Sequence, residues 1–397
     1  MKRKVLYIEG NVDGTIGGSY YVMIDLVKAL DKMQYEPIVG FHTDNSLIPM
    51  LKEAGIETHV FDNPAPFSFT IPALNFILLP VKKTINLFKK LLLPALRYAR
   101  FIRHNNIDLV NGNNSIMLNQ TWMLAAMLTK TRCITHEMGI NTRFSFLSRY
   151  LGKRLGAIIC VSNVVRDNMV RLGLEFPNIR VVHNGLDLSR YHIVETPSEL
   201  RSKYNIGDTD PIIGVVGNIR VWKGQEIIVR AMSELVEKHS NIRCLLVGAS
   251  SLTDAPYKGK LISICKDLDI EDNVIFTGFQ NNPIDYMNLM DIVVHTSVEP
   301  EPFGIVLLEA MFLAKPLIST TIGGPAEIVV NGESGLLVEP GKPELLAEAV
   351  DKLLSNPIYA KEIGQHGNRR LHEEFTIQEN AEKTMIIYDE VFGQRVT

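Results

Sequence analysis

Two glutamates, Glu301 and Glu309, stand on either side of the point where a helix is predicted to begin. The chain turns through two prolines and opens the helix at Gly304. A helix N-terminus offers unpaired backbone N–H groups and the positive end of the helix dipole, which suits a diphosphate. Glu309 would lie about 7 Å further along the helix axis. Because a carboxylate accepts two hydrogen bonds from a vicinal diol, the two glutamates are suited to hold a sugar and a ribose beside that diphosphate.

Each glutamate also has a simpler interpretation. Glu309 would be a solvated helix residue, but the apolar runs Ile305–Leu308 and Ala310–Leu313 predict a helix buried on all sides. A buried carboxylate needs a partner, which favours ligand contact for Glu309. Glu301 would be one loop acid among others, because Glu299 is an equal candidate by chemistry.

Two cations follow a buried strand in the second half of the chain. The strand Ile212–Val216 ends in a loop that carries Arg220 and Lys223, before a helix that starts near Gln225. Cations at the carboxyl end of a strand neutralise a diphosphate, most strongly as it leaves with extra charge. The alternative is a pair of solvated surface cations.

A glycine-rich loop joins the first predicted strand to the first helix. Its Gly17 and Gly18 carry no Cβ, so the backbone can approach a ligand closely. The loop has neither the GxGxxG spacing nor a Walker lysine, and an ordinary strand–helix turn is the alternative.

His136 directly follows Thr135, at the carboxyl end of the predicted strand Cys133–Thr135. A histidine at the carboxyl end of a parallel strand reaches the edge where such sheets bind ligands. The alternative is a structural histidine, which is the more common role for a lone histidine.

Short apolar strand patterns alternate with amphipathic helix patterns, and the series runs twice. Such alternation predicts crossover connections and parallel sheets covered on both faces. The expected strands are Val5–Glu9, Pro37–Phe41, Thr58–Phe61, Leu109–Asn111, Cys133–Thr135, Ala157–Val161 and Arg180–Val182, and then Ile212–Val216, Arg243–Val247, Val274–Phe276, Ile292–His295, Pro316–Ser319 and Gly335–Val338. The predicted fold class is α/β, with two doubly wound, Rossmann-like domains facing each other across a cleft.

A polar stretch without periodicity separates the two series. We therefore expect an N-terminal domain over residues 1–190, a C-terminal domain over 191–376 and a last helix over 377–397. Asp208 and Asp210 in that stretch look like a metal-binding acid pair, but a turn is the better interpretation.

Composition limits the class of protein. The formal charge of −3 argues against a nucleic-acid partner. The four cysteines are scattered without metal-like spacing, which indicates reduced cysteines in a cytoplasmic protein. Four apolar residues, Val5–Ile8, stand between Lys4 and Glu9. This run is too short for the hydrophobic region of a signal peptide.

The segment 66–103 is an apolar insertion rich in lysine and arginine. Prolines and lysine pairs break its apolar runs below the roughly 18 residues that a membrane span needs. Large apolar residues among cations suit the inner face of an anionic membrane, on which the protein would lie peripherally. The alternative is an ordinary pair of helices that covers the cleft.

Taken together, these segments resemble the large family 4 of retaining glycosyltransferases. The central match is the family's Glu-x7-Glu signature, from Glu301 through Pro302-Phe303-Gly304 to Glu309. The supporting matches are Arg220-Val221-Trp222-Lys223-Gly224, Gly323-Gly324-Pro325-Ala326-Glu327-Ile328, Asn331–Val338, Val161-Ser162 and Val182–Asp187. The C-terminal half matches nearly throughout, and the N-terminal half matches in islands.

The resemblance implies the GT-B fold and retaining transfer of a sugar from a nucleotide-diphosphate sugar, with a UDP or GDP conjugate as the expected donor. The acceptor would be a glycan or a lipid-linked molecule, as in cell-surface polysaccharide or glycolipid synthesis. No metal and no further cofactor are expected. The leaving phosphate would help to deprotonate the acceptor, so no catalytic base is named.

The resemblance also assigns residues. Glu309 would hold the ribose hydroxyls and Glu301 the sugar hydroxyls. The residues expected to bind the diphosphate are Arg220, Lys223, Gly17, Gly18, Phe303, Gly304 and Ile305. His136 matches the family's active-site histidine and completes the expected catalytic set with Glu301, Arg220 and Lys223. The family usually has aspartate after that histidine, where this chain has Glu137, so no role is inferred for position 137.

Two alternative functions would use the same nucleotide site. One is a sugar-nucleotide epimerase or hydrolase, and the other is a non-catalytic nucleotide-sugar binding protein. Product analysis separates the first from a transferase, and slow donor hydrolysis separates an enzyme from a binder. The sequence does not specify the donor sugar, the base, the linkage or the oligomeric state.

Overall fold

The computed structural model describes residues 2–11, 17–61, 68 and 78–393. The chain forms two compact units, one of Met1–Gly185 with Ile377–Thr397 and the other of Leu186–Thr376. The sequence places the boundary after residue 190, whereas the second unit begins at Leu186. The backbone N–H of Leu186 donates a 2.8 Å hydrogen bond to the carbonyl of Phe375, which ties this residue to the second unit.

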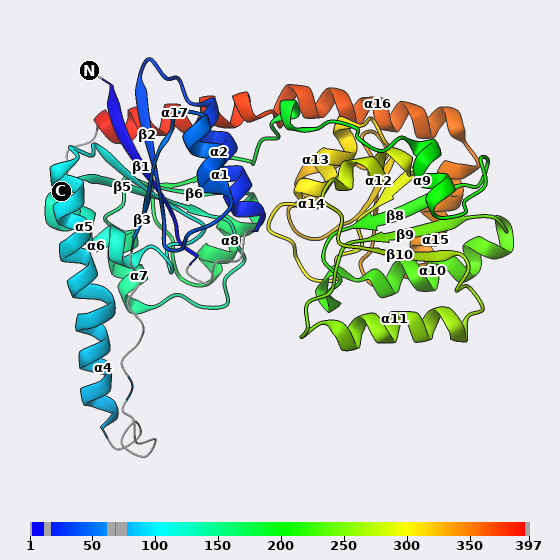
Figure 1. Cartoon of the computed structure of the whole chain (residues 1–397), viewed down its shortest axis with the longest axis horizontal. Coiled ribbons are helices and arrows are strands. Elements are labelled where there is room, and N and C mark those ends of the chain that lie inside the picture. The colour runs from blue at the N-terminus through cyan, green and yellow to red at the C-terminus, as the bar shows by residue number, and fades with distance from the viewer. Residues whose placement is uncertain (1, 12–16, 62–67, 69–77, 394–397) are drawn as a thin grey trace. The chain divides into compact units, whose positions relative to one another are not determined.

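The first unit contains a seven-stranded sheet in the order β3-β2-β1-β4-β5-β6-β7 (Figure 1). Every pairing in it is parallel. Its strands are β1 Arg3–Glu9, β2 Tyr35–Phe41, β3 Glu57–Val60, β4 Leu109–Asn113, β5 Arg132–Glu137, β6 Ala157–Cys160 and β7 Ile179–Val181. Strand β4 and all but the first residue of β5 are buried along their length, as central strands of a sheet covered on both faces should be.

Helices connect these strands as crossovers. They are α1 Gly18–Ala29, α2 Leu47–Glu53, α5 Leu93–His104, α6 Gln120–Thr129, α7 Phe146–Gly152 and α8 Asn163–Arg171. Ser162 caps α8 by accepting a hydrogen bond from the backbone N–H of Val165, and Ser145 caps α7 in the same way.

The second unit contains a six-stranded parallel sheet in the order β10-β9-β8-β11-β12-β13. Its strands are β8 Ile212–Val216, β9 Arg243–Val247, β10 Val274–Gly278, β11 Ile292–Val294, β12 Leu317–Thr320 and β13 Leu336–Val338. Its helical segments are η2 Leu188–Arg190, α9 Pro197–Lys203, η3 Val221–Lys223, α10 Gln225–Lys238, α11 Ala255–Asp267, α12 Pro283–Leu289, α13 Ile305–Phe312, α14 Pro325–Ile328, α15 Pro343–Leu354 and α16 Pro357–Glu374. The predicted class of two doubly wound α/β units is confirmed.

Each sheet has a point where the strand order reverses. In the first unit β1 lies beside β4, and in the second unit β8 lies beside β11. Doubly wound sheets bind ligands at the carboxyl ends of the strands at such a point. The predicted site residues of the second unit follow β8 and β11, and His136 lies near the end of β5, beside β4.

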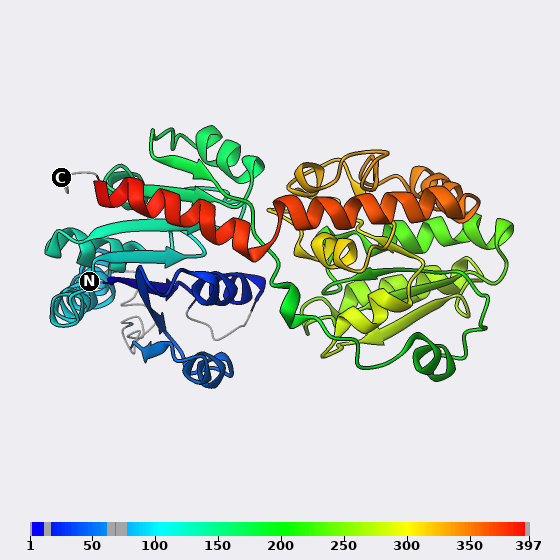
Figure 2. The ribbon, with the colours of Figure 1, turned by 90° about the horizontal axis from the view of Figure 1, so that it is seen from above.

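The last helix, α17 Ile377–Gly393, packs on the first unit against α1 (Figure 2). Its Tyr388 hydroxyl lies 2.6 Å from the hydroxyl of Tyr7 on β1. Arg132 of β5 donates hydrogen bonds to the carbonyls of Val391 and Phe392 near the end of the helix. This helix therefore belongs to the first unit although it follows the second in sequence.

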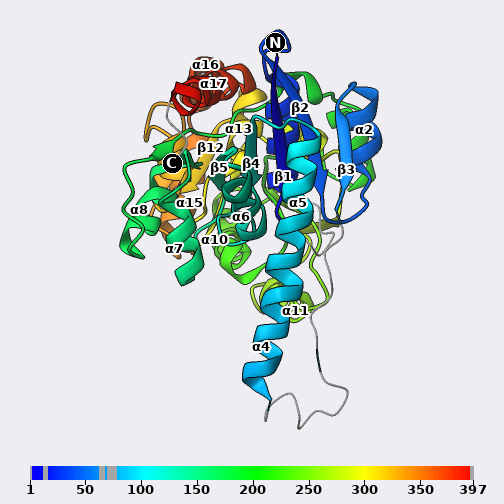
Figure 3. The same ribbon diagram turned by 90° about the vertical axis from the view of Figure 1, so that its left-hand side faces the viewer.

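Helix α4 Leu79–Leu87, the π-helical turn η1 Phe88–Leu92 and α5 form one continuous rod (Figure 3). Five residues of α5 are buried, among them Tyr98 and Ile102, whereas α4 and η1 have none. The rod therefore projects from the body of the first unit. Most of the predicted insertion before it, residues 66–67 and 69–77, lies outside the described residues. Among the helices described, none is long and apolar enough to cross a membrane.

Candidate active site

Lys223 and Glu301 form a largely buried ion pair in the second unit. The ammonium of Lys223 lies 2.7 Å from Glu301 Oε1 and 2.8 Å from Oε2. The two side chains are only 16% and 13% exposed. Lys223 ends η3 after β8, and Glu301 lies in the connection after β11, so the ion pair joins the two loops at the switch point. Glu299, the alternative by chemistry, is exposed.

Two further polar side chains contact the Glu301 carboxylate and a third lies behind them, and none of the three was predicted from the sequence. His295 Nε2 lies 2.5 Å from Glu301 Oε2, and Ser297 Oγ donates to the same oxygen at 3.0 Å. Ser319 Oγ lies 3.0 Å from the other ring nitrogen of His295. The available signal was the run His295-Thr296-Ser297, a polar stretch directly after a buried strand. Although burial raises the pKa of Glu301, hydrogen bonding by His295 and the charge of Lys223 hold that pKa well below its usual range.

The backbone of Glu301 is fixed by a close approach from a second loop. The N–H of Gly324 donates a 2.8 Å hydrogen bond to the carbonyl of Glu301, and Gly323 forms a bridge with Glu301. Gly323 has φ +79°, and a Cβ added there would lie 2.5 Å from the backbone N and O of Glu301. The Gly323-Gly324 pair is required because no side chain fits between the two loops.

Helix α13 begins immediately after this region. Its N-cap, Gly304, has φ +110°, and no side chain caps the helix. Phe303 is buried, whereas Ile305 is partly exposed. The first turn of α13 thus presents backbone N–H groups near the ion pair, as a diphosphate site needs.

The expectation that α13 is buried on all sides is wrong. Leu307, Leu308, Ala310 and Met311 are buried, but the face that carries Glu309 is only partly covered. The helix contacts α14, α16 and β12 through its buried side. An apolar sequence does not by itself determine how deeply each face is covered.

Glu309 accepts a 3.0 Å hydrogen bond from the hydroxyl of Tyr191. Burial raises the pKa of Glu309 to about 7, although the hydrogen bond from Tyr191 and the charge of Arg190 lower it. The ring of Tyr191 packs against Phe312, one turn further along α13. The sequence did not indicate Tyr191 as a partner of Glu309, because the two residues lie 118 positions apart in the chain.

Arg220 is not part of the buried cluster. Its side chain is 46% exposed, and its Nε lies 3.5 Å from Asp254 Oδ2. It begins η3 as the N-cap, three residues before Lys223. Of the two predicted cations after β8, Lys223 is therefore largely buried and Arg220 is accessible to solvent.

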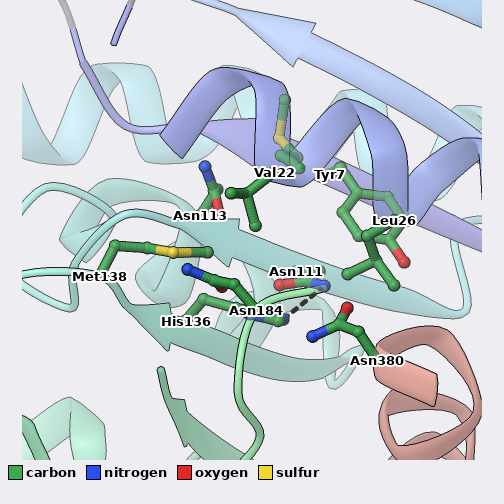
Figure 4. Close-up of a pocket in the computed structure, with 10 residues that line it drawn as sticks. Tyr7, Val22, Leu26, Asn111, Asn113, His136, Met138, Asn184 and Asn380 are labelled. Atoms are coloured by element: carbon green, nitrogen blue, oxygen red, sulfur yellow. Dashed lines mark hydrogen bonds between the residues drawn. The ribbon is translucent and has the colours of Figure 1, made fainter. Parts of the chain in front are cut away.

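In the first unit, His136 lies at a polar cluster that lines a small pocket (Figure 4). Its Nε2 lies 3.4 Å from Asn111 Nδ2, and Asn111 donates a second hydrogen bond, of 2.7 Å, to the Tyr388 hydroxyl. Burial lowers the pKa of His136 to about 4, so the imidazole is neutral at pH 7. Asn111 and Tyr388 were not predicted as site residues.

Gly17 and Gly18 lie at the start of α1, and a Cβ at either position would meet nothing within 4 Å. The adjoining loop residues 12–16 lie outside the described residues. Asn113 links this helix start to β1, because its Nδ2 donates to the carbonyl of Ser19 at 3.1 Å and to Glu9 Oε2 at 2.6 Å. Burial raises the pKa of Glu9, and its hydrogen bonds with Asn113 and with neighbouring groups lower it.

Glu137, beside His136, is buried and binds two loops. It accepts hydrogen bonds from the backbone N–H of Ile116 and from Asn141 Nδ2. Burial raises the pKa of Glu137 to about 8, although these hydrogen bonds lower it. The side chain therefore connects the loops after β4 and β5. Within the described part of the chain, no group of three or more His, Cys, Asp or Glu residues is arranged to hold a metal ion.

A largely buried lysine–carboxylate pair, an uncapped helix start and a second carboxylate along the same helix lie at one sheet edge of the second unit. A neutral histidine lies at the corresponding edge of the other unit. Two doubly wound α/β units in one chain are the architecture of the GT-B class of glycosyltransferases.

Comparison with known families assigns the chain within this class. Residues 16–190 match the model described as Glycosyltransferase Family 4, and residues 197–370 match the model described as Glycosyl transferases group 1. The chain therefore belongs to glycosyltransferase family 4, a family of GT-B enzymes.

Individual relatives are distant. The N-acetyl-α-D-glucosaminyl L-malate synthase of Bacillus anthracis is 25% identical over 358 residues, which is 86% of this chain and 91% of that enzyme. The capsular polysaccharide biosynthesis glycosyltransferase CapM of Staphylococcus aureus is 27% identical over 55% of each chain. The crystal structure of Anabaena HepE in complex with UDP superposes with a TM-score of 0.81 at 23% identity, and covers 98% of this chain and 100% of that one. This last likeness confirms the fold.

Proposed function

We propose that the chain transfers a sugar, with retention of anomeric configuration, from a nucleotide-diphosphate sugar to a glycan or lipid-linked acceptor. The observation that carries the proposal is the Lys223–Glu301 ion pair beside the uncapped start of α13. It sets a cation, a carboxylate and backbone N–H groups together at one sheet edge. Family membership and the UDP complex of HepE support a UDP or GDP conjugate as the donor.

In the proposed reaction, the bond between the anomeric carbon and the β-phosphate oxygen breaks. An acceptor hydroxyl oxygen bonds to the same carbon on the same face, and its proton passes to the departing phosphate. Lys223 and Arg220 neutralise the charge that develops on the diphosphate, and Glu301 holds the sugar hydroxyls. Glu309 holds the ribose hydroxyls. His136, neutral at pH 7, contributes a hydrogen bond near the reacting centre.

The proposal includes independence from metal ions. The charge of a diphosphate needs a positive partner, and Lys223 and Arg220 with the helix dipole of α13 supply one without a divalent cation. Turnover in the presence of excess EDTA should equal turnover without it. A loss of activity that Mg²⁺ or Mn²⁺ restores would contradict this part of the proposal.

The first test is titration calorimetry of UDP, GDP, ADP and their sugar conjugates against the wild type and Glu309→Ala. One nucleotide should bind tightly to the wild type and lose most of its affinity in the variant. Glu333→Ala, an exposed position on a different loop, is the control and should bind as the wild type does. If no nucleotide binds, or if Glu309→Ala binds unchanged, the donor site is wrongly assigned.

The second test identifies the reaction. NMR of the product formed from the donor that binds should show a glycosidic bond with the anomeric configuration of the donor. An inverted product would exclude retention. Conversion of the donor to an epimer, or only to free sugar, would favour the epimerase or hydrolase alternative.

We also propose that the rod of α4, η1 and α5 lies on the surface of an anionic membrane, where a lipid-linked acceptor would be found. Between Leu79 and Ile107 the chain has no Asp or Glu. The apolar residues exposed along the rod are Leu79, Val81, Leu87, Phe88, Leu92 and Leu96. The lysines among them are Lys82, Lys83, Lys89 and Lys90. Each cation near an anionic surface contributes about 1 kcal/mol, and the apolar side chains add burial in the interface.

Sedimentation with vesicles tests this location. The wild type should bind vesicles of phosphatidylcholine mixed with phosphatidylglycerol more strongly than vesicles of phosphatidylcholine alone. Replacement of the four rod lysines by glutamate should abolish the difference. The matched control replaces Lys52, Lys266, Lys342 and Lys361, which are exposed elsewhere, by glutamate and changes the net charge equally. Equal binding of the two variants to the anionic vesicles would show that net charge, and not the rod, determines vesicle binding.

A further inference from the structure

His295 is fully enclosed behind Glu301. Its side chain is 4% exposed, and both ring nitrogens have partners. Nε2 lies 2.5 Å from Glu301 Oε2, and Nδ1 lies 3.0 Å from Oγ of Ser319. Ser319 is completely buried on β12, the strand next to β11. Ser319, His295 and Glu301 thus form a chain of hydrogen-bonded groups from the core of the sheet to the carboxylate, which we call the relay.

The direction of the relay follows from the carboxylate. An ionised carboxylate only accepts hydrogen bonds, so Nε2 must carry the proton that it shares with Glu301. In the neutral imidazole Nδ1 is then an acceptor, and the Ser319 hydroxyl donates to it. Ser297 Oγ donates to the same carboxylate oxygen at 3.0 Å and lies 3.1 Å from Nε2. Two groups of the protein interior thus hold Oε2 independently of Lys223.

Lys223 has two tasks under the proposed function. Without a donor it binds both oxygens of Glu301, and with a donor it binds the diphosphate. A cation that turns toward a diphosphate gives up part of its interaction with Glu301. The carboxylate is 13% exposed, so it would then depend on its remaining partners for position and for hydrogen bonds.

We propose that His295 is a positioning residue for sugar transfer, which holds the Glu301 carboxylate in place and hydrogen-bonded while Lys223 serves the diphosphate. This inference rests on the proposed function of the donor site. The Ser319 hydroxyl holds the ring of His295 at Nδ1, and Ser297 supplies the second hydrogen bond to Oε2. Neither His295 nor Ser319 needs to touch the substrate.

The inference predicts a selective kinetic defect in His295→Leu. Misplacement of Glu301 should lower kcat by on the order of 10- to 100-fold, because small errors of placement at a reacting centre have effects of that size. The affinity for the nucleotide without its sugar should change little, because Glu309 and the start of α13 bind that part. His295→Gln retains an N–H donor and should recover much of the lost turnover.

A matched control is available in the same unit. His239 Nε2 lies 2.8 Å from Asp351 Oδ1, a similar histidine–carboxylate pair between α10 and α15. His239→Leu should lower the thermal midpoint without changing kcat or nucleotide affinity. If His295→Leu behaves like His239→Leu, the role of His295 is structural and the inference is overturned.

A spectroscopic measurement tests the relay if His295→Leu does not fold. The ¹⁵N shifts of His295, assigned by the signal that His295→Gln lacks, should report a proton on Nε2. Ser319→Ala removes the contact at Nδ1, so it should loosen the ring and lower kcat with unchanged nucleotide affinity. A ring without a proton on Nε2 in the wild type, or full turnover in Ser319→Ala, would overturn the inference. Failure of the wild type to bind any nucleotide would instead refute the donor site itself.

Discussion

The hydroxyl of Tyr191 donates a 3.0 Å hydrogen bond to Oε1 of Glu309, so the carboxylate proposed to hold the ribose already has a partner from the segment that opens the second unit. The aromatic ring is anchored on Phe312 of the same helix, with 5.5 Å between ring centroids. Tyr191 therefore orients Glu309 and stabilises its ionised form. Because burial still raises the pKa of Glu309, we expect donor binding to depend on pH.

Donor affinity should rise with pH between about 6 and 8. Burial raises the pKa of Glu309 to about 7, and only the ionised carboxylate accepts both ribose hydrogen bonds. In Tyr191→Phe the loss of the donated hydrogen bond should raise that pKa further, so the midpoint of the affinity curve should move to higher pH. Calorimetry with the sugar conjugate, whose phosphates keep a constant charge over this range, measures the effect. A flat curve in the wild type, or coincident curves for both proteins, would contradict it.

Gly323→Ala should impair turnover far more than a similar change at Gly341. Both glycines have positive φ, +79° and +76°, so alanine at either costs about 1–2 kcal/mol of backbone strain. Only at Gly323 would the new Cβ lie 2.5 Å from the backbone of Glu301, whereas at Gly341 it meets nothing within 4 Å. Thermal midpoints and kcat of the two variants separate strain from displacement of Glu301. Equal losses of kcat would mean that the contact with Glu301 has no role in the reaction.

Tyr388→Phe should reduce both stability and turnover. Removal of the hydroxyl breaks its buried hydrogen bonds with the Asn111 amide and the Tyr7 hydroxyl, at a cost of about 1–3 kcal/mol. Because Asn111 also contacts His136, kcat should fall as the imidazole loses its fixed orientation. Tyr35→Phe is the control, since its hydroxyl bonds Asp389 on the same helix but has no link to Asn111. Denaturant unfolding and kcat are measured for both, and an equal effect of the two variants on kcat would refute the link to His136.

Glu137→Gln should remove a pH dependence from the stability of the first unit. Burial raises the pKa of Glu137 from 4.5 to about 8, so between these values the folded chain binds a proton that the unfolded chain does not. The stability that this group contributes is present below pH 4.5 and is lost as pH rises through about 8. The thermal midpoint of the wild type relative to Glu137→Gln should therefore fall from pH 5 to pH 8. The exposed Glu333→Gln should show no such trend, and a constant difference for Glu137→Gln would refute the raised pKa.

Local sequence was sufficient for much of the fold. The strands Ile212–Val216 and Arg243–Val247 have the predicted bounds. Each is a continuous pattern bounded by polar or proline residues, so neighbours in sequence decide it. The boundary between the two units was placed too late, because Leu186 is held by Phe375, a contact that no local pattern encodes.

The candidate site was predicted only in part for the same reason. The sequence by itself determined the two-unit α/β class and the family. It also placed Lys223, Glu301 and His136 near strand ends and Glu309 inside a helix, since these positions depend on spacing along the chain. Only the tertiary structure decided which groups meet them. Hydrogen bonds between β12 and the residue that follows β11, and between α17 and β4, join residues far apart in sequence. Such partners are selected by distance, burial and orientation in the folded chain, and these quantities exist only after folding.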